Sequence, residues 1–151
     1  MISTLHVLSI GSQETGALVR DVLVLRSRCR LYVASSTWDI SVVFGSEEID
    51  VAILHNTFSS PQLRVFAAYI RRRWPYAKIL LIRRKGENTD YCIYDERIAP
   101  GVSPKTFLTA IERLGACARR ARRPIANSPY NQISKQNDSS QTTFTRAVKR
   151  S

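Results

Sequence analysis

The sequence has few of the residues that build metal centres and disulfide frameworks. It contains three cysteines, Cys29, Cys92 and Cys117, and two histidines, His6 and His55. The number of cysteines is odd, their spacings are wide and no C-x-x-C pair occurs, so a zinc site and a disulfide framework are both poorly supported. We expect the thiols to be reduced and buried, as free cysteines usually are.

Motifs of catalysis and of membrane insertion are also missing. There is no G-x-S-x-G elbow, no G-x-G-x-x-G loop and no Walker pattern, and no cluster of residues nominates an enzyme. The N-terminus lacks a basic segment followed by a long apolar run, and no apolar stretch approaches the roughly 20 residues that cross a bilayer. We predict a cytoplasmic protein that spans no membrane, is not an enzyme, and binds no cofactor or metal.

Acidic residues are scarce, with 12 Asp and Glu against 23 Lys and Arg and a net charge of +11. Residues 1–118 carry 15 basic and 11 acidic side chains, whereas residues 119–151 carry 8 basic and 1 acidic. More than half of the excess charge therefore lies in the last 33 residues. Such a balance favours acidic partners, namely nucleic acid, an anionic membrane surface or an acidic protein.

Five short apolar runs alternate with helical segments, which predicts a parallel sheet covered on both faces. A folded part of about 120 residues fits the flavodoxin-like α/β fold, a doubly wound five-stranded sheet of order 2-1-3-4-5. We assign this domain to residues 1–123 and a disordered, basic and polar tail to residues 124–151. The expected strands are Leu5–Ile10, Leu31–Ala34, Asp50–Leu54, Ala77–Ile82 and Arg97–Ala99.

Apolar residues at helical spacing mark one face of each long helical segment. The first set is Leu18, Val22 and Leu25. The second is Leu63, Phe66, Ala67, Ile70 and Trp74, and the third is Phe107, Ile111, Leu114 and Ala118. A shorter helix is expected over Trp38–Phe44, although its β-branched residues weaken it.

In open α/β sheets, function gathers beyond the carboxyl ends of the strands. The residues expected at these ends are Gly11, Ser12, His55, Arg83 and Ala99. His55 directly follows the apolar run of the third strand. A lone histidine in this place is more often a hydrogen-bonded structural residue than a phosphohistidine relay, and both roles stay open.

The order of elements, the strand-three passage DVAILHN and the passage IRRRWPYAKILLI over residues 70–82 resemble bacterial response-regulator receiver domains. Pro100 followed by Ser103-Pro104 resembles the family's last strand and last helix. The resemblance covers residues 4–118 and implies a phosphorelay or two-component signalling module. It also implies a docking or dimerisation face, here residues 88–118. Tyr94 and Phe107 would lie on this face or in the core.

The family's active positions are not matched. The resemblance implies an acidic pair after strand one, where Gly11-Ser12 stand, and a phosphoacceptor aspartate at His55. It implies a Ser or Thr at Arg83 and a lysine at Ala99. Because Mg²⁺ prefers carboxylate ligands and stabilises the phosphoryl group, we predict an inactive phosphoacceptor position at His55. The module is then expected to act by binding a protein partner. A second copy of the chain, in a homodimer, is one such partner.

Four arginines form a basic cluster near the end of the last helix, and the basic tail follows them. These are Arg119, Arg120, Arg122 and Arg123. Clustered arginines can neutralise phosphates, so the alternative prediction is a protein that contacts nucleic acid through this arm. Because no helix-turn-helix, zinc finger or RNA-binding motif is present, such binding would be non-specific.

Overall fold

The computed structural model describes residues 4–11, 15–43, 48–55, 57–84, 86 and 93–123. The expected tail, residues 124–151, lies outside the described residues. The elements, in chain order, are β1 (Leu5–Ile10), α1 (Thr15–Arg26), β2 (Cys29–Ala34), α2 (Thr37–Val43), β3 (Val51–Leu54), α3 (Ser60–Arg73), β4 (Lys78–Ile82), β5 (Glu96–Ile98) and α4 (Pro104–Arg122).

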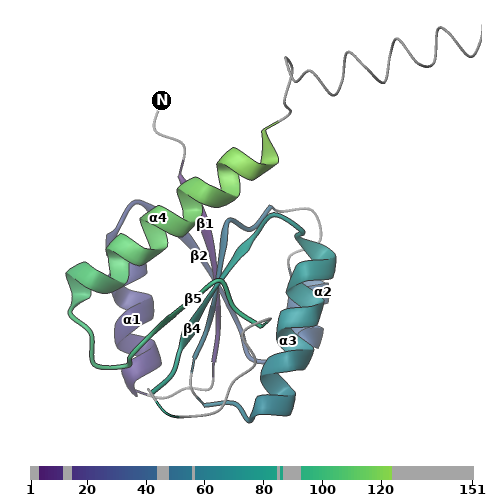
Figure 1. Cartoon of the computed structure of the whole chain (residues 1–151), viewed down its shortest axis with the longest axis horizontal. Helices are drawn as coiled ribbons and strands as arrows, with labels where there is room; N and C mark the ends of the chain where they lie inside the picture. The colour runs from purple at the N-terminus through teal and green to yellow at the C-terminus, as the bar shows by residue number, and fades with distance from the viewer. Residues whose placement is uncertain are drawn as a thin grey trace, which may run out of the picture.

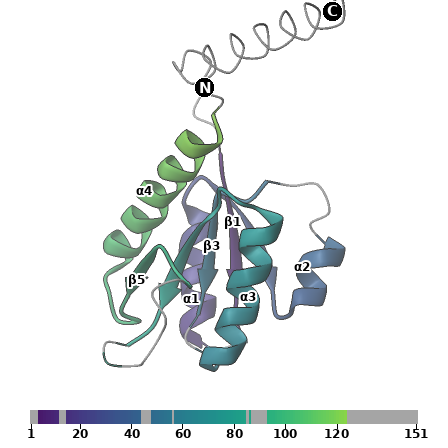
Figure 2. The same ribbon diagram turned by 45° about the vertical axis from the view of Figure 1, so that its right-hand side comes forward.

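The strands form one parallel sheet in the order β2-β1-β3-β4-β5, which confirms the predicted topology. Helices α1 and α4 cover one face of the sheet, and α2 and α3 cover the other (Figure 1). Right-handed crossovers between parallel strands produce this doubly wound arrangement. The view in Figure 2 shows the same layers from a second direction.

Helices α3 and α4 form where the sequence supplies caps and an apolar face. The Ser59 side chain accepts the Gln62 backbone N–H while the Gln62 side chain accepts the Ser59 N–H, a capping box. Ser103 caps α4 in the same place, on the Thr106 N–H. The second and third predicted apolar sets are buried against the two faces of the sheet, as expected. No helix in the described part of the chain is long and apolar enough to span a bilayer.

Helix α1 departs from the expected pattern. Leu18, Val22 and Leu25 share one face, as their spacing predicts, but that face is turned to solvent, with 53%, 47% and 62% of each residue exposed. The helix packs on the sheet through Ala17 and Val24 instead. The residues halfway between these two, at positions 20 and 21, are charged, so the inner face of α1 is partly polar.

Candidate functional site

The carboxyl ends of the parallel strands meet at one edge of the sheet, as predicted. Gly11 follows β1, His55 follows β3 and Arg83 follows β4. Arg83 donates from Nη2 to Ser60 Oγ (3.4 Å), at the start of α3. Ala99 follows β5 and is exposed, while Ser12 lies outside the described residues.

His55 is fully buried at the end of β3, and both of its ring nitrogens have partners within the chain. Nε2 lies 2.8 Å from Ser9 Oγ of β1, and Nδ1 lies 2.8 Å from Arg20 Nη1 of α1. Asp21 hydrogen-bonds Ser9, and its Oδ1 lies 3.9 Å from His55 Nε2. We call Ser9, Arg20, Asp21 and His55 the buried polar cluster.

The partners of His55 fix its protonation state. A guanidinium only donates hydrogen bonds, so Nδ1 must accept from Arg20 and the single ring proton must sit on Nε2. Nε2–H then donates to Ser9 Oγ, whose hydroxyl proton is left for Asp21. Burial lowers the pKa of His55 to about 4, and the positive charge of Arg20 acts in the same direction. His55 is therefore neutral at pH 7.

Ser9, His55 and Asp21 are the residue types of a hydrolase triad, but their arrangement is the wrong one. A triad requires a carboxylate on Nδ1 and an unprotonated Nε2 that can take the serine proton. Here a cation occupies the Nδ1 side, so Nε2 already carries a proton and cannot act as a base toward Ser9. Ser9 is also 1% exposed, out of reach of a substrate. The cluster is thus not a nucleophilic site.

Asp21 is the one acidic member of the buried polar cluster. Burial raises the pKa of its carboxyl, while the hydrogen bond from Ser9 and the charge of Arg20 lower it. Oδ1 is buried and has no hydrogen-bond partner among the described residues. The guanidinium beside it supplies the compensating positive charge that a buried carboxylate needs.

Gly11 allows the imidazole to lie close to the end of β1. A Cβ atom placed at Gly11 would meet His55 Cδ2 at 2.9 Å and His55 Cγ at 3.2 Å. Beside them lies a cavity of about 40 Å³, lined by Ser9, Asp21, His55 and apolar neighbours. That volume is of the order of one or a few water molecules.

Receiver domains hold a divalent cation at this edge, and the residues that the structure describes there do not fit one. Mg²⁺ prefers several carboxylate oxygens, whereas the buried polar cluster offers one carboxylate with a guanidinium beside it. Across the residues that the structure describes, no group of three His, Cys, Asp or Glu side chains is arranged to hold a metal ion.

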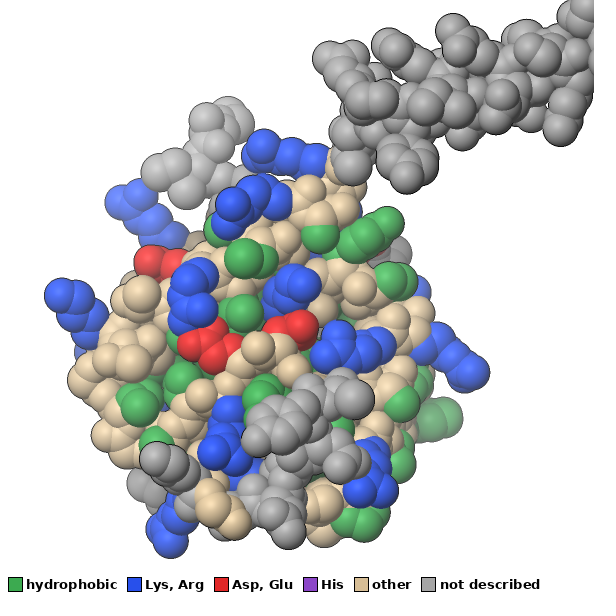
Figure 3. All heavy atoms as spheres, viewed as in Figure 1, with side chains coloured by type: hydrophobic (Ala, Val, Ile, Leu, Met, Phe, Trp, Pro, Cys, Tyr) green, Lys and Arg blue, Asp and Glu red, His purple; other side chains and the backbone are tan. Residues whose placement is uncertain are grey.

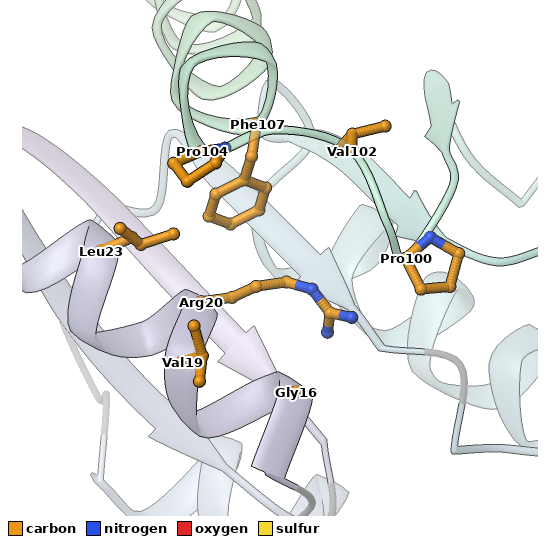
Figure 4. A pocket seen from close by; sticks show the side chains of 8 residues that line it. All are labelled: Gly16, Val19, Arg20, Leu23, Pro100, Val102, Pro104 and Phe107. Carbon is orange, nitrogen blue, oxygen red and sulfur yellow. The ribbon is translucent and has the colours of Figure 1, made fainter.

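Arg20 reaches His55 along a second, larger cavity. This cavity of about 310 Å³ lies between α1 and the segment that joins β5 to α4. Figure 4 shows the aliphatic stem of Arg20 passing between Val19 and Phe107, with Leu23 and Val102 also on the walls. These apolar side chains cover part of the stem, while the guanidinium extends toward the strand ends and His55.

The predicted basic cluster lies at the opposite edge of the sheet. Arg122 Nη1 donates to Asp50 Oδ1 (3.0 Å) and Arg119 Nη2 donates to Asp50 Oδ2 (3.3 Å). Asp50 is 1% exposed and also accepts the backbone N–H of His6. Through Asp50, Arg119 and Arg122 therefore connect the end of α4 to the starts of β1 and β3.

The other two members of the basic cluster, Arg120 and Arg123, are exposed. Figure 3 shows the Lys and Arg side chains of the α4 and β5 face scattered over it rather than joined in one patch. Nucleic-acid contact through this cluster stays a prediction, with Arg120 and Arg123 as its exposed members.

The predicted docking face, residues 88–118, is described in part. Residues 88–92 lie outside the described residues, and residues 93–118 include β5 and most of α4. Phe107 is 2% exposed and belongs to the core, and Tyr94 is partly buried against the core of the other face. Glu96 of β5 and Arg113 of α4 form an ion pair across this surface.

The sequence located His55 but not its partners. Ser9 lies inside an apolar run, and Arg20 and Asp21 lie in a helix whose apolar stripe suggested that they face solvent. One signal could have found them: Arg20 and Asp21 stand three or four residues from both Ala17 and Val24, which places all four on one face of a helix.

The comparisons with known proteins agree with this geometry at the level of the fold. No protein-family model and no curated protein matches the sequence. An uncharacterized protein from Neptuniibacter caesariensis matches with a TM-score of 0.70 at 10% identity, over 82% of this chain and 96% of that one. The signal receiver domain of an HD domain-containing protein from Pseudomonas fluorescens Pf-5 matches with a TM-score of 0.64 at 15% identity, over 79% and 92%.

A response regulator from Thermotoga maritima matches with a TM-score of 0.61 at 15% identity, over 76% of this chain and 99% of that one. At these identities the likeness concerns the backbone, and the side chains of the site have to be judged on this chain alone. The strand order, the helix layers and these structures together show that the chain has the fold of response-regulator receiver domains.

Proposed function

We propose that this chain is a receiver-like signalling module of the phosphorelay or two-component type, which binds a protein partner and is not switched by aspartyl phosphorylation. The observation that carries the proposal is the state of His55. It stands at the end of β3, fully buried, with Ser9 and Arg20 on its two nitrogens. An imidazole held in this way is neither a carboxylate acceptor nor a nucleophile open to a phosphodonor.

Arg20 supports the same proposal. Phosphoryl transfer in receivers needs a metal that neutralises the developing charge. Here a fixed internal cation stands beside the strand ends, and the described residues provide no carboxylate cluster for a metal. The module then keeps one structural state at this edge, and its contribution to signalling is the surface that it offers to a partner. It performs no catalysis of its own.

Intact-mass spectrometry after incubation with acetyl phosphate and Mg²⁺ tests the proposal. We expect no phosphoryl adduct on this chain, while a receiver domain that has its acidic cluster gains one under the same conditions. Affinity capture of partners before and after this treatment should recover the same proteins in the same amounts. A stoichiometric adduct on any residue at the strand ends would contradict the proposal, as would partner binding that changes with acetyl phosphate.

A further inference from the structure

The outward face of α1 is apolar although it is in contact with solvent. Leu18, Val22 and Leu25 are each about half exposed or more. Val33 of the neighbouring strand β2 is 57% exposed and lines the same small cavity as Leu18, so the apolar surface continues from the helix onto the sheet. A contiguous apolar stripe of this kind marks a surface that another molecule covers.

The stripe runs beside an outer edge of the described sheet. β2 is an outer strand of the described sheet, paired with β1 on one side. The Ala34 carbonyl accepts from Gly11 N, toward β1. Because backbone groups alternate along a strand, those of Leu31 and Val33 point to the open side. An outer strand with outward N–H and C=O groups is a template for pairing with another strand.

Charges at the two ends of this edge are of opposite sign. The exposed Arg26, Arg28 and Arg30 lie at the start of β2, on the chain entering the strand. Asp39 of α2 lies at the other end, where its carboxylate accepts the backbone N–H of Ser35 (3.0 Å). An antiparallel pairing of two β2 edges brings each basic end to the acidic end of the other copy. A parallel pairing would bring arginine to arginine, which is unfavourable.

From these three observations we propose that the chain forms a two-fold symmetric dimer, in which the β2 edges pair antiparallel and the α1 stripes pack on each other. A two-fold interface is self-complementary, and this edge has that property. Centring the axis on Tyr32 sets Leu31 opposite Val33 of the second copy, where both residues exchange N–H···O bonds. The two sheets then form one continuous sheet, with both α1 helices on the same face.

The available surface is of the right order for such a dimer. The exposed apolar area of the stripe together with Val33 is on the order of 400 Å² per copy. A standard interface buries about 800 Å² per partner. The strand edges and the flanking Arg30 and Asp39 make up the difference. The dimer uses neither the buried polar cluster nor the surface around α4, so it is independent of the proposed function.

Sedimentation equilibrium of the full chain over a concentration series tests the dimer. Val22→Glu puts a carboxylate into the stripe and should weaken association by about tenfold or more. Val65→Glu is the matched control, because Val65 is 59% exposed on α3, on the other face of the sheet, and this change should leave association unaltered. Leu25→Glu gives a second, independent test of the stripe if Val22→Glu alters the circular dichroism spectrum.

A charge exchange tests the antiparallel arrangement. Arg30→Asp and Asp39→Arg should each weaken the dimer, and the double variant should restore it, because each new charge again meets its opposite in the second copy. Within one copy the two residues lie at opposite ends of the edge, so restoration reports an intermolecular contact. A chain that stays monomeric at every concentration overturns the proposal, with the stripe then left to a different protein. Equal effects of Val22→Glu and Val65→Glu, or a double variant no stronger than the single ones, also overturn it.

Discussion

Lowering the pH should destabilise the folded chain through His55. In the unfolded chain this imidazole takes up a proton near its ordinary pKa of 6.5, whereas in the folded chain its pKa is lowered to about 4. Between these values only the unfolded state gains the proton, so the free energy of unfolding falls as the pH falls. This contribution is fully present above pH 6.5 and is lost progressively toward pH 4.

The size of the effect follows from the shift. Between pH 7.5 and pH 4.5, the His55 contribution should fall by about 2.5 kcal/mol. Asp21 acts in the opposite sense, because burial raises the pKa of its carboxyl and acid then favours the folded state. Other carboxylates add their own pH dependence. The His55 contribution therefore has to be isolated by comparison with a variant.

His55→Gln is the comparison we would use. Glutamine keeps one donor for Ser9 and one acceptor for Arg20 but does not titrate. Urea unfolding of both proteins at pH 7.5 and pH 4.5 gives two differences in the free energy of unfolding. We expect the wild type to lose about 2 to 3 kcal/mol more than His55→Gln. Equal losses would show that His55 is not held neutral by burial, and the proton assignment in the buried polar cluster would be wrong.

Two further substitutions, one of them with a matched control, test the packing around the site and at the far edge of the sheet. Asp50→Ala should lower the free energy of unfolding by about 2 to 3 kcal/mol in urea, because two arginines of α4 and a backbone N–H lose their acceptor. Glu48→Gln is the control, because Glu48 forms an exposed ion pair with the same helix; it should change the free energy of unfolding by less than about 0.5 kcal/mol. Equal effects of the two substitutions would refute the anchoring role of Asp50. Gly11→Ala should cost about 1 to 2 kcal/mol by thermal or urea unfolding, since the added Cβ meets the ring of His55; a neutral or stabilising result would mean that the ring can shift.

Periodicity was enough to predict the backbone from the sequence. The strands are short, apolar and separated by caps such as Ser59 and Ser103. Their alternation with helices, the right-handed crossovers and the length of the folded part favoured the strand order that the structure has. The apolar sets of α3 and α4 predicted their buried faces correctly, because a long helix on a sheet buries its apolar side.

The same rule failed for α1. Leu18, Val22 and Leu25 have regular helical spacing, but the opposite face of the helix is turned to the sheet. That face carries Arg20, which contacts His55, and Asp21, which contacts Ser9. Whether a charged residue lies inside depends on partners from other strands, and sequence spacing within one helix does not contain that information. The position of His55 was predictable because it ends a strand. Its protonation state was not, because that depends on Arg20.

NMR spectroscopy of the ¹⁵N-labelled chain with Mg²⁺ and then beryllofluoride, a phosphoryl mimic, tests the central claim most directly. If the buried polar cluster occupies the space at the strand ends, the amide signals of Gly11 and His55 should not shift with either addition. Saturable shifts of these signals, first with Mg²⁺ and then with beryllofluoride, would show an open metal and phosphoryl site and would contradict the account.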